Sequence, residues 1–389
     1  MAGTLPAAGT ASAAADPQRV TVDLAASEGP VMHGANGTLY GLSDDGVPSD
    51  AALAPLKITS VSQKPEGGAQ HPNGDALTVS KSFFRNGGGE ILVMMQDIYS
   101  KWPYEDLGID DYLPKVDKIV EEVSADPNSD RFVYIPFNEP DQIWYNLGTS
   151  NQAQYEINRD RFFKDWKTVY QRIRAIDPDA RIAGPNESGY HTRLLTDFLA
   201  FAKRENVLPQ IMTWHELDSS SLRNFQGNYD SYRAIEKNLG ISPLKINIDE
   251  YANRRDLSVP GQLAQWVSMF ERNKVYANQA YWDAVGNMDG NVVRSNIPNG
   301  GWWFFRWYAG LPTPPRTAAV GKTEAQLVRL VELRSKLLTL HHTPIDTLAT
   351  RRHTAETTRC PTTEAPVAGP LPLAFRPSSV SHASAGNPT

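Results

Sequence analysis

The chain has 389 residues, enough for one large domain with a substantial core and a smaller accessory part. Its net charge of -6 and its pI near 5.8 argue against a nucleic-acid-binding protein, which would carry a basic patch. No apolar stretch is long enough to span a bilayer, and the single cysteine, Cys360, excludes an intramolecular disulfide and a multi-cysteine metal site.

The N-terminal residues are rich in Ala, Gly and Thr, and Ala13-Ala14-Ala15 before Asp16 resembles a signal-cleavage site. No basic or strongly apolar stretch precedes this site. We interpret residues 1–19 as the remnant of a truncated secretion signal, which predicts an extracellular protein. The alternative is a disordered leader, and neither interpretation adds an element to the fold.

Short apolar segments then alternate with segments of helical periodicity. The predicted strands are Gly34–Leu42, Ile58–Gln63, Glu90–Asp97, Arg131–Phe137, Arg181–Pro185, Gln210–His215, Lys245–Asp249 and Gln279–Asp283. The predicted helices are Asp110–Ser124, Tyr155–Ile176, Thr192–Glu205, Asn228–Asn238 and Pro260–Asn273. In the second of these helices, one buried face is predicted by the spacing of Phe162, Trp166, Val169, Tyr170 and Ile173.

Eight strands that alternate with helices are typical of a (β/α)8 TIM barrel, an α/β fold. The rival architecture is a doubly wound open sheet. It would usually carry a glycine-rich phosphate turn after its first strand, and no such turn follows Gly34–Leu42.

Two glutamates stand at the carboxyl ends of separate predicted strands. Glu139, within Asn138-Glu139-Pro140, follows the fourth strand, and Glu250 follows the seventh. In a (β/α)8 barrel the chemistry takes place at this end of the strands. A retaining glycosidase needs two such carboxyl groups, one to protonate the leaving oxygen and one to attack the anomeric carbon. Asn138 is placed to bond a sugar hydroxyl beside the reacting centre. As alternatives, Glu139 could be a loop carboxylate and Glu250 part of a surface ion pair.

Other polar or aromatic side chains follow four more strands: Gln96 and Asp97 the third, Asn186 and Glu187 the fifth, His215 and Glu216 the sixth, Trp282 and Asp283 the eighth. Any of these pairs could instead be the ordinary start of a loop. His215 could be a core histidine bonded to backbone, and Trp282 could simply pack in the barrel.

Metal and cofactor chemistry are not predicted. No His-x-x-x-His pair occurs, and the acidic strand ends are too dispersed to require a cation. No Gly-x-Ser-x-Gly nucleophile elbow occurs either. An aromatic run, Trp302–Tyr308, could stack on sugars, but its helical spacing favours the core.

The composition changes after Leu311. Phe375 is the only aromatic residue beyond Tyr308, and basic residues outnumber acidic ones. One amphipathic helix is predicted at Thr323–Leu340. The rest of residues 312–389 is rich in Pro, Thr, Ala and Ser, which predicts an atypical, partly disordered tail.

Three segments resemble the clan A glycoside hydrolases, and most closely glycoside hydrolase family 39: Phe137-Asn-Glu-Pro140, Ile248-Asp-Glu-Tyr251 and Asn299–Tyr308. The resemblance covers about residues 20–311. It implies a (β/α)8 fold and a retaining mechanism with Glu139 as acid/base and Glu250 as nucleophile. It also implies a sugar contact from Asn138 and a platform from Trp282.

The chain departs from this pattern in two places. Many clan members carry His-x-Tyr on the sixth strand, whereas this chain has His215-Glu216-Leu217, so Tyr251 or Tyr281 is expected to hold Glu250 instead. Relatives also complete an accessory β-sandwich. Val20–Leu24 would supply one of its strands, but the tail does not supply the others. We therefore expect residues 20–311 to form the barrel, with an incomplete or absent sandwich. We interpret the tail after Leu311 as a frame-shifted or truncated end.

The sequence thus predicts a secreted retaining exo-glycosidase acting on polysaccharide side chains, with pentose-containing substrates implied by the resemblance. A pocket closed by the loop Gly67–Asp75 would favour exo action, and a long open cleft would favour an endo-acting clan A glycanase. The alternative from another class is an inactive carbohydrate-binding protein. Carbohydrate is the expected partner, with no nucleic acid or membrane, and the oligomeric state is left open.

Overall fold

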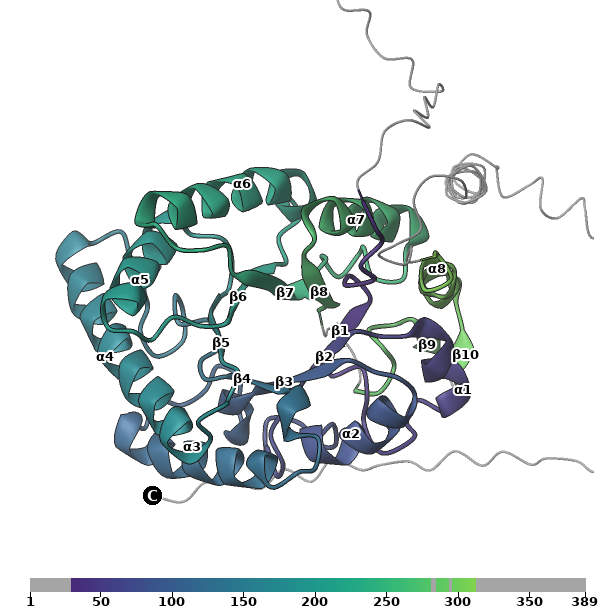
Figure 1. Cartoon of the computed structure of the whole chain (residues 1–389), viewed down its shortest axis with the longest axis horizontal. Helices are drawn as coiled ribbons and strands as arrows, with labels where there is room; N and C mark the ends of the chain where they lie inside the picture. The colour runs from purple at the N-terminus through teal and green to yellow at the C-terminus, as the bar shows by residue number, and fades with distance from the viewer. Residues whose placement is uncertain (1–28, 281–284, 294–295, 313–389) are drawn as a thin grey trace, which may run out of the picture. The chain divides into compact units, whose positions relative to one another are not determined.

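A computed structural model describes residues 29–280, 285–293 and 296–312. Within them, parallel strands form an eight-stranded sheet in the order β4-β3-β2-β1-β8-β7-β6-β5 (Figure 1). A parallel bridge between Tyr134 and Ile182 joins its two ends, so the sheet is a closed barrel. The strands are β1 Gly37–Leu39, β2 Ser60–Gln63, β3 Glu90–Met94, β4 Phe132–Ile135, β5 Ala183–Glu187, β6 Ile211–Glu216, β7 Lys245–Tyr251 and β8 Tyr276–Gln279.

Helices surround the ring of strands (Figure 1). They are α1 Asp50–Leu53, α2 Ala76–Arg85, α3 Ile109–Ser124, α4 Gln152–Ile176, α5 Thr192–Arg204, α6 Ser221–Leu239, α7 Pro260–Asn273 and α8 Gly300–Tyr308. Short 3-10 turns lie at η1 Ala54–Leu56, η2 Met95–Ile98 and η3 Ser129–Arg131, and β9 Val292–Val293 pairs with β10 Ile297–Pro298. The predicted (β/α)8 fold is confirmed.

The position predicted for the eighth strand is wrong. β8 spans Tyr276–Gln279, so it ends at the residue where Gln279–Asp283 was expected to begin. The neighbouring strand decides this placement, because Gly37 of β1 pairs with Asn278 and has no Cβ to collide with the Asn278 side chain. Sequence analysis also missed α1 and α2, and it placed the start of α6 at Asn228 rather than Ser221.

The predicted apolar face of α4 is confirmed. Asn151 caps the helix by accepting a hydrogen bond from the Gln154 N–H, and the helix ends before Asp177-Pro178. Trp166 also donates from its ring nitrogen to the carbonyl of Val207 at 3.0 Å. The buried side chains of this face are Phe162, Trp166, Val169, Tyr170 and Ile173.

Ion pairs lie across the amino end of the barrel. Glu90, the first residue of β3, pairs with Arg181 at 2.9 Å and with Lys245, the first residue of β7. Paired charges of this kind satisfy one another inside the barrel mouth. The carboxyl ends of the strands are therefore the end left for a binding site.

The aromatic run on α8 is only partly core. Trp302, Phe304, Phe305 and Tyr308 are buried as expected, but Trp303 and Trp307 are 48% and 44% exposed. A helix has one buried stripe, and these two residues lie one turn apart on its opposite side.

Several predictions fall outside the described residues: the leader 1–19, the strand Val20–Leu24, Tyr281 and Trp282, and the tail with its helix Thr323–Leu340. They stay predictions. Among the residues that the structure describes, no helix is both long and apolar enough to cross a membrane.

Candidate active site

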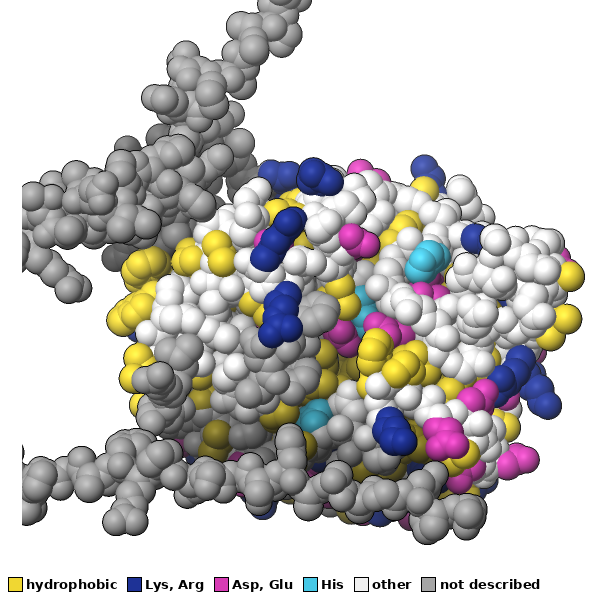
Figure 2. Space-filling model, turned by 180° about the vertical axis from the view of Figure 1, so that it is seen from behind, with side chains coloured by type: hydrophobic (Ala, Val, Ile, Leu, Met, Phe, Trp, Pro, Cys, Tyr) yellow, Lys and Arg dark blue, Asp and Glu magenta, His cyan; other side chains and the backbone are white. Residues whose placement is uncertain are grey.

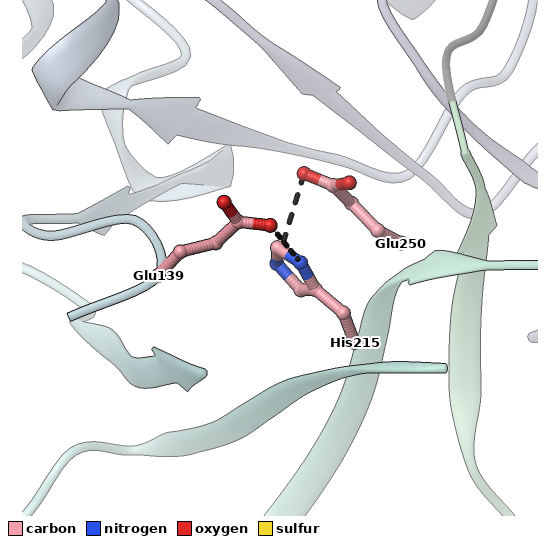
Figure 3. A group of neighbouring side chains, drawn as sticks. All are labelled: Glu139, His215 and Glu250. Carbon is pink, nitrogen blue, oxygen red and sulfur yellow. Dashed lines mark ion pairs between the residues drawn. The ribbon is translucent and has the colours of Figure 1, made fainter. Parts of the chain in front are cut away.

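Glu139 and Glu250 lie on either side of His215, as Figure 3 shows. His215 is on β6, between the strands that supply the two glutamates. Its Nδ1 is 3.3 Å from Glu139 Oε1, and its Nε2 is 3.6 Å from Glu250 Oε1. One oxygen of each glutamate and one nitrogen of the histidine lie within 4.8 Å of one another. The structure therefore brings together the two carboxyl groups named from the sequence.

The backbone at Glu139 is held in an uncommon conformation. Its φ is +49°, in the left-handed region that a residue with a Cβ adopts only at a cost. Its N–H donates to the carbonyl of Asn186 at 2.8 Å, and its own carbonyl accepts from the N–H groups of Gln142 and Ile143. These bonds fix the direction in which the Glu139 side chain leaves the backbone.

An irregularity in β7 aims Glu250 at the site. From Ile248 to Tyr251, β7 contains one residue more than the part of β8 that pairs with it. The pairing of β7 with β6 shows the same extra residue. A β-bulge of this kind re-aims the side chains that follow it. Asp249 and Glu250 consequently both approach His215, although strict alternation would send them to opposite faces of the sheet.

The same bulge turns Tyr251 away from the site. Its ring packs on Trp266 and Phe270 of α7, and its hydroxyl donates to the carbonyl of Ala35 at 3.1 Å. The expectation that Tyr251 contacts the sugar or holds Glu250 therefore does not fit the structure. Trp282 lies outside the described residues, so its role as a sugar platform stays a prediction.

Three amides named from the sequence meet beside Glu139. Gln96 accepts a hydrogen bond from the backbone N–H of Asn138 at 2.6 Å, and Asn186 donates from its side chain to Asn138 Oδ1 at 2.9 Å. All three are buried. Gln96 and Asn186 therefore fix the orientation of Asn138, and the Asn186 carbonyl also accepts from the N–H of Glu139.

Glu216, the other polar residue at the end of β6, points away from this group. It accepts hydrogen bonds at 2.9 Å from Trp214 and from Asn228 of α6. His215 and Glu216 are consecutive on a strand, so their side chains leave opposite faces of the barrel wall.

The acidic neighbours of His215 favour its positively charged form. Burial by itself lowers the pKa of His215, but Glu250, Glu139 and Asp249 outweigh that effect and raise it to about 10. The ring nitrogens face carboxylate oxygens of Glu139, Glu250 and Asp249 at 3.3, 3.6 and 3.9 Å, and these negative charges stabilise the imidazolium. The imidazolium offsets part of the negative charge that the carboxyl groups would otherwise concentrate here.

Two further carboxyl groups crowd Glu250. Burial raises the pKa of Glu250 to about 8; His215 opposes this shift, and Glu139, Asp249 and Asp97 add to it. Burial likewise raises the pKa of Asp249 and that of Asp97 to about 6. Burial therefore favours the protonated form of Glu250 near neutral pH, while the imidazolium of His215 favours the ionised form that can attack a substrate. The Glu250 side chain keeps 14% of its exposure, so a substrate can reach it.

Sequence analysis missed Asp249, Tyr40 and Tyr104 as members of the site. Asp249 stands next to Glu250 and could have been suspected from that position alone. Tyr40 and Tyr104, whose hydroxyls donate to Asp97, come from the end of β1 and from the loop after η2. No local sequence pattern marks these two tyrosines, because residues so far from Glu250 in the sequence cannot be recognised as its neighbours before the fold is known.

Glu139, His215 and Glu250 are also the one set of three among the described residues that could hold a metal ion. Imidazole and carboxylate suit Zn²⁺. An ion there would occupy both reactive carboxyl groups.

A surface hollow of about 520 Å³ is lined by Tyr170, Arg174 and Glu205, and its lining includes none of the three residues of the candidate site. Acidic side chains also gather near the middle of the face in Figure 2, beside histidine and apolar side chains.

No protein-family model matches the chain. It is 40% identical over 340 residues to a 3-O-beta-L-arabinopyranosyl-alpha-L-arabinofuranosidase of Bifidobacterium pseudocatenulatum, an alignment that covers 76% of this chain and 34% of the relative. It is 36% identical over 351 residues to a 3-O-alpha-D-galactosyl-alpha-L-arabinofuranosidase of Bifidobacterium longum subsp. longum, covering 78% of this chain and 31% of that protein. The chain thus spans about a third of the length of these curated relatives.

Among solved structures, the chain is similar to N2152 from Neocallimastix frontalis. The TM-score is 0.65 at 29% sequence identity, with 73% of this chain and 70% of that chain covered. This similarity extends over most of the described barrel.

Proposed function

We propose that the barrel is a retaining glycoside hydrolase that cleaves α-L-arabinofuranosidic bonds. The observation that carries the proposal is the carboxyl pair of Glu139 and Glu250, whose nearest oxygens lie within 4.8 Å at the carboxyl ends of β4 and β7. Retaining glycosidases hold these groups about 5–5.5 Å apart, whereas inverting enzymes need roughly 6.5–9.5 Å to admit a water molecule. The short separation supports double displacement.

In the first step an oxygen of ionised Glu250 attacks the anomeric carbon and forms a glycosyl ester. The bond from that carbon to the leaving oxygen breaks, and Glu139 gives its proton to the leaving oxygen. In the second step Glu139 takes a proton from water, the water oxygen attacks the anomeric carbon, and the ester bond to Glu250 breaks. Formation of the ester removes the charge of Glu250, which frees Glu139 to act as a base.

The substrate class comes from the similar proteins. Both curated relatives are named for an α-L-arabinofuranoside that carries another sugar at its 3-O position. We infer the same class for this chain, namely a 3-O-substituted arabinofuranosyl unit released from a polysaccharide side chain.

The loop Gly67–Asp75 supports exo action. The N–H groups of Ala69 and Gln70 donate to the carbonyl of Asp97, and the His71 ring meets the edge of Tyr40 at 4.4 Å between centroids. The loop is thereby tied to Asp97 and Tyr40, and we infer that it limits the length of glycan that the site accepts. Secretion and membership of family 39 remain predictions from the leader and from the three sequence motifs.

The proposal is tested with purified protein, 4-nitrophenyl α-L-arabinofuranoside and arabinogalactan side-chain oligosaccharides. Glu250→Gln should lower kcat by about a thousandfold or more, whereas Glu216→Gln, a buried strand-end carboxylate outside the pair, should keep its activity. NMR of the first product should show the anomer of the substrate, and the opposite anomer would contradict retention.

Other outcomes identify the alternatives. Cleavage inside an unbranched glycan, with no release of terminal units, would identify an endo-acting glycanase. A protein that folds cooperatively and binds sugar, but hydrolyses nothing as wild type or as Glu250→Gln, would be a carbohydrate-binding protein.

A further inference from the structure

Two tyrosines hold one buried carboxylate beside the reactive pair. Tyr40, directly after β1, donates to Asp97 Oδ2, and Tyr104, in the loop after η2, donates to Asp97 Oδ1. All three residues are buried: Tyr40 is 3% exposed, Tyr104 is 4% exposed and Asp97 is 0% exposed. Both oxygens of the carboxylate are thus engaged by phenol groups. We call these three residues the tyrosine–aspartate triad.

The triad lies within the electrostatic reach of the glutamates. Burial raises the pKa of Tyr40 and of Tyr104 well above the usual range, Asp97 adds to the shift, and Glu250 adds further to both. Glu139 also acts on Tyr104. Geometry places the triad at the same end of the barrel: Gln96, next to Asp97, accepts a hydrogen bond at 2.6 Å from the N–H of Asn138, which precedes Glu139.

Backbone contacts fix the two tyrosines of the triad separately. Tyr40 has a φ of +51°, which is costly for an aromatic residue, and its N–H donates to the Ser62 carbonyl at 2.8 Å. The Tyr104 carbonyl accepts from the Trp144 ring nitrogen at 3.2 Å. Strain of this kind persists where the surroundings enforce it, and it concentrates at functional sites.

We propose that the tyrosine–aspartate triad is a sugar-binding wall that recognises a hydroxyl group of the arabinofuranosyl ring bound between Glu139 and Glu250. Because both phenol protons point to Asp97, the tyrosine oxygens offer lone pairs that accept a hydrogen bond from a sugar hydroxyl. A buried group arranged to bond a substrate hydroxyl discriminates strongly against analogues that lack it. This inference rests on the proposed function and names residues that set its specificity.

The test compares hydrolysis of a 4-nitrophenyl α-L-arabinofuranoside that carries arabinopyranose at its 3-O position with that of three analogues, namely its 2-deoxy form, its 5-deoxy form and the unsubstituted 4-nitrophenyl α-L-arabinofuranoside. Tyr40→Phe and Tyr104→Phe should each lower kcat/KM on the parent sugar by about 10- to 100-fold. On the analogue that lacks the recognised hydroxyl, each variant should differ from wild type by less than about threefold, since the partner of the tyrosine is already gone. The comparison within one analogue cancels its intrinsic reactivity.

Tyr155→Phe is the matched control. Tyr155 is also buried and donates to a carboxylate, Asp197 at 2.9 Å, but this pair joins α4 to α5 outside the barrel. This variant should follow wild type on all four substrates. Asp97→Asn provides a second measurement if a tyrosine variant fails to fold, and it should show the same dependence on one hydroxyl.

If the tyrosine variants lose the same factor in kcat/KM on the parent and on all three analogues, the inference is overturned and the triad is only a structural support. Wild-type hydrolysis of the parent in the same assay keeps the proposed function intact in that case. If folded wild type and Tyr155→Phe hydrolyse none of the four substrates, the proposed function fails, and the sugar-binding role of the triad fails with it.

Discussion

Around Glu250, one imidazolium faces a group of buried carboxyl groups that compete for protons. The resting pair of Glu139 and Glu250 needs one proton between them, because one group must donate and the other must attack. The pKa of about 8 at Glu250 marks the pH at which this attacking group loses its proton in the free protein. Residue-scale predictions therefore concern how activity depends on pH.

We expect kcat/KM to rise with pH toward about 8, by up to tenfold per pH unit, because only ionised Glu250 can attack the anomeric carbon. The measurement is a pH profile of kcat/KM on an aryl arabinofuranoside. A flat profile between pH 5 and pH 8 would show that ionisation of Glu250 does not control the rate.

His215→Asn should move this acidic limb to higher pH and lower kcat/KM by about 10-fold or more. The positive charge of His215 lowers the pKa of Glu250, so its removal makes Glu250 hold its proton more tightly and leaves it less often ionised. His33→Asn is the control, since His33 precedes β1 at the other end of the barrel and packs on Tyr308. An unchanged limb in His215→Asn would rule out this coupling.

At the scale of elements, the barrel depends on close approach between particular strands. A Cβ at Gly37 would collide with Asn278 of β8 and approach the Ser60 carbonyl of β2. A Cβ at Gly227, within α6, would meet no atom within 4 Å. The same substitution should therefore have opposite effects at these two positions.

Gly37→Ala should lower the free energy of unfolding by about 1–3 kcal/mol, since a packed strand interface has no room for a methyl group. Gly227→Ala should raise it by about 0.5–1 kcal/mol, because alanine loses less backbone freedom than glycine in a helix. Chemical denaturation of both variants against wild type measures the two values. Stabilisation by Gly37→Ala would contradict the β1–β8 pairing described here.

For the whole molecule, several buried groups make stability depend on pH in one direction. Glu250 and Glu187 have pKa values raised to about 8 by burial, and that of His215 is raised to about 10 by its acidic neighbours in spite of burial. In each case the folded state binds protons more tightly than the unfolded chain. Stability linked to these groups is thus present at low pH and lost as pH rises.

We therefore expect Tm to fall as pH rises from about 5 to 9, with part of the loss between the ordinary pKa of glutamate and 8, and a further part between 6.5 and 10 from His215. Glu250→Gln should flatten this slope, because glutamine does not titrate. Scanning calorimetry across this range checks both statements. A Tm that rises steadily to pH 9 would contradict them.

The sequence by itself determined the repeating α/β pattern and the two glutamates at strand ends. Periodicity of apolar side chains is a local property, so α4 and all eight strands overlap their predicted ranges, although β8 does so at Gln279 alone. Asn138-Glu139-Pro140 and Glu250 stand out for the same reason, as each follows a buried strand directly.

Only the tertiary structure decided which side chains face the reactive pair. The bulge in β7 sends Glu250 inward and Tyr251 outward, and it shows itself only in the register with β6 and β8. The triad of Tyr40, Asp97 and Tyr104 likewise joins two separate segments of the chain at one edge of the barrel. Strand register and loop contacts depend on partners far away in the sequence, so local patterns cannot specify them.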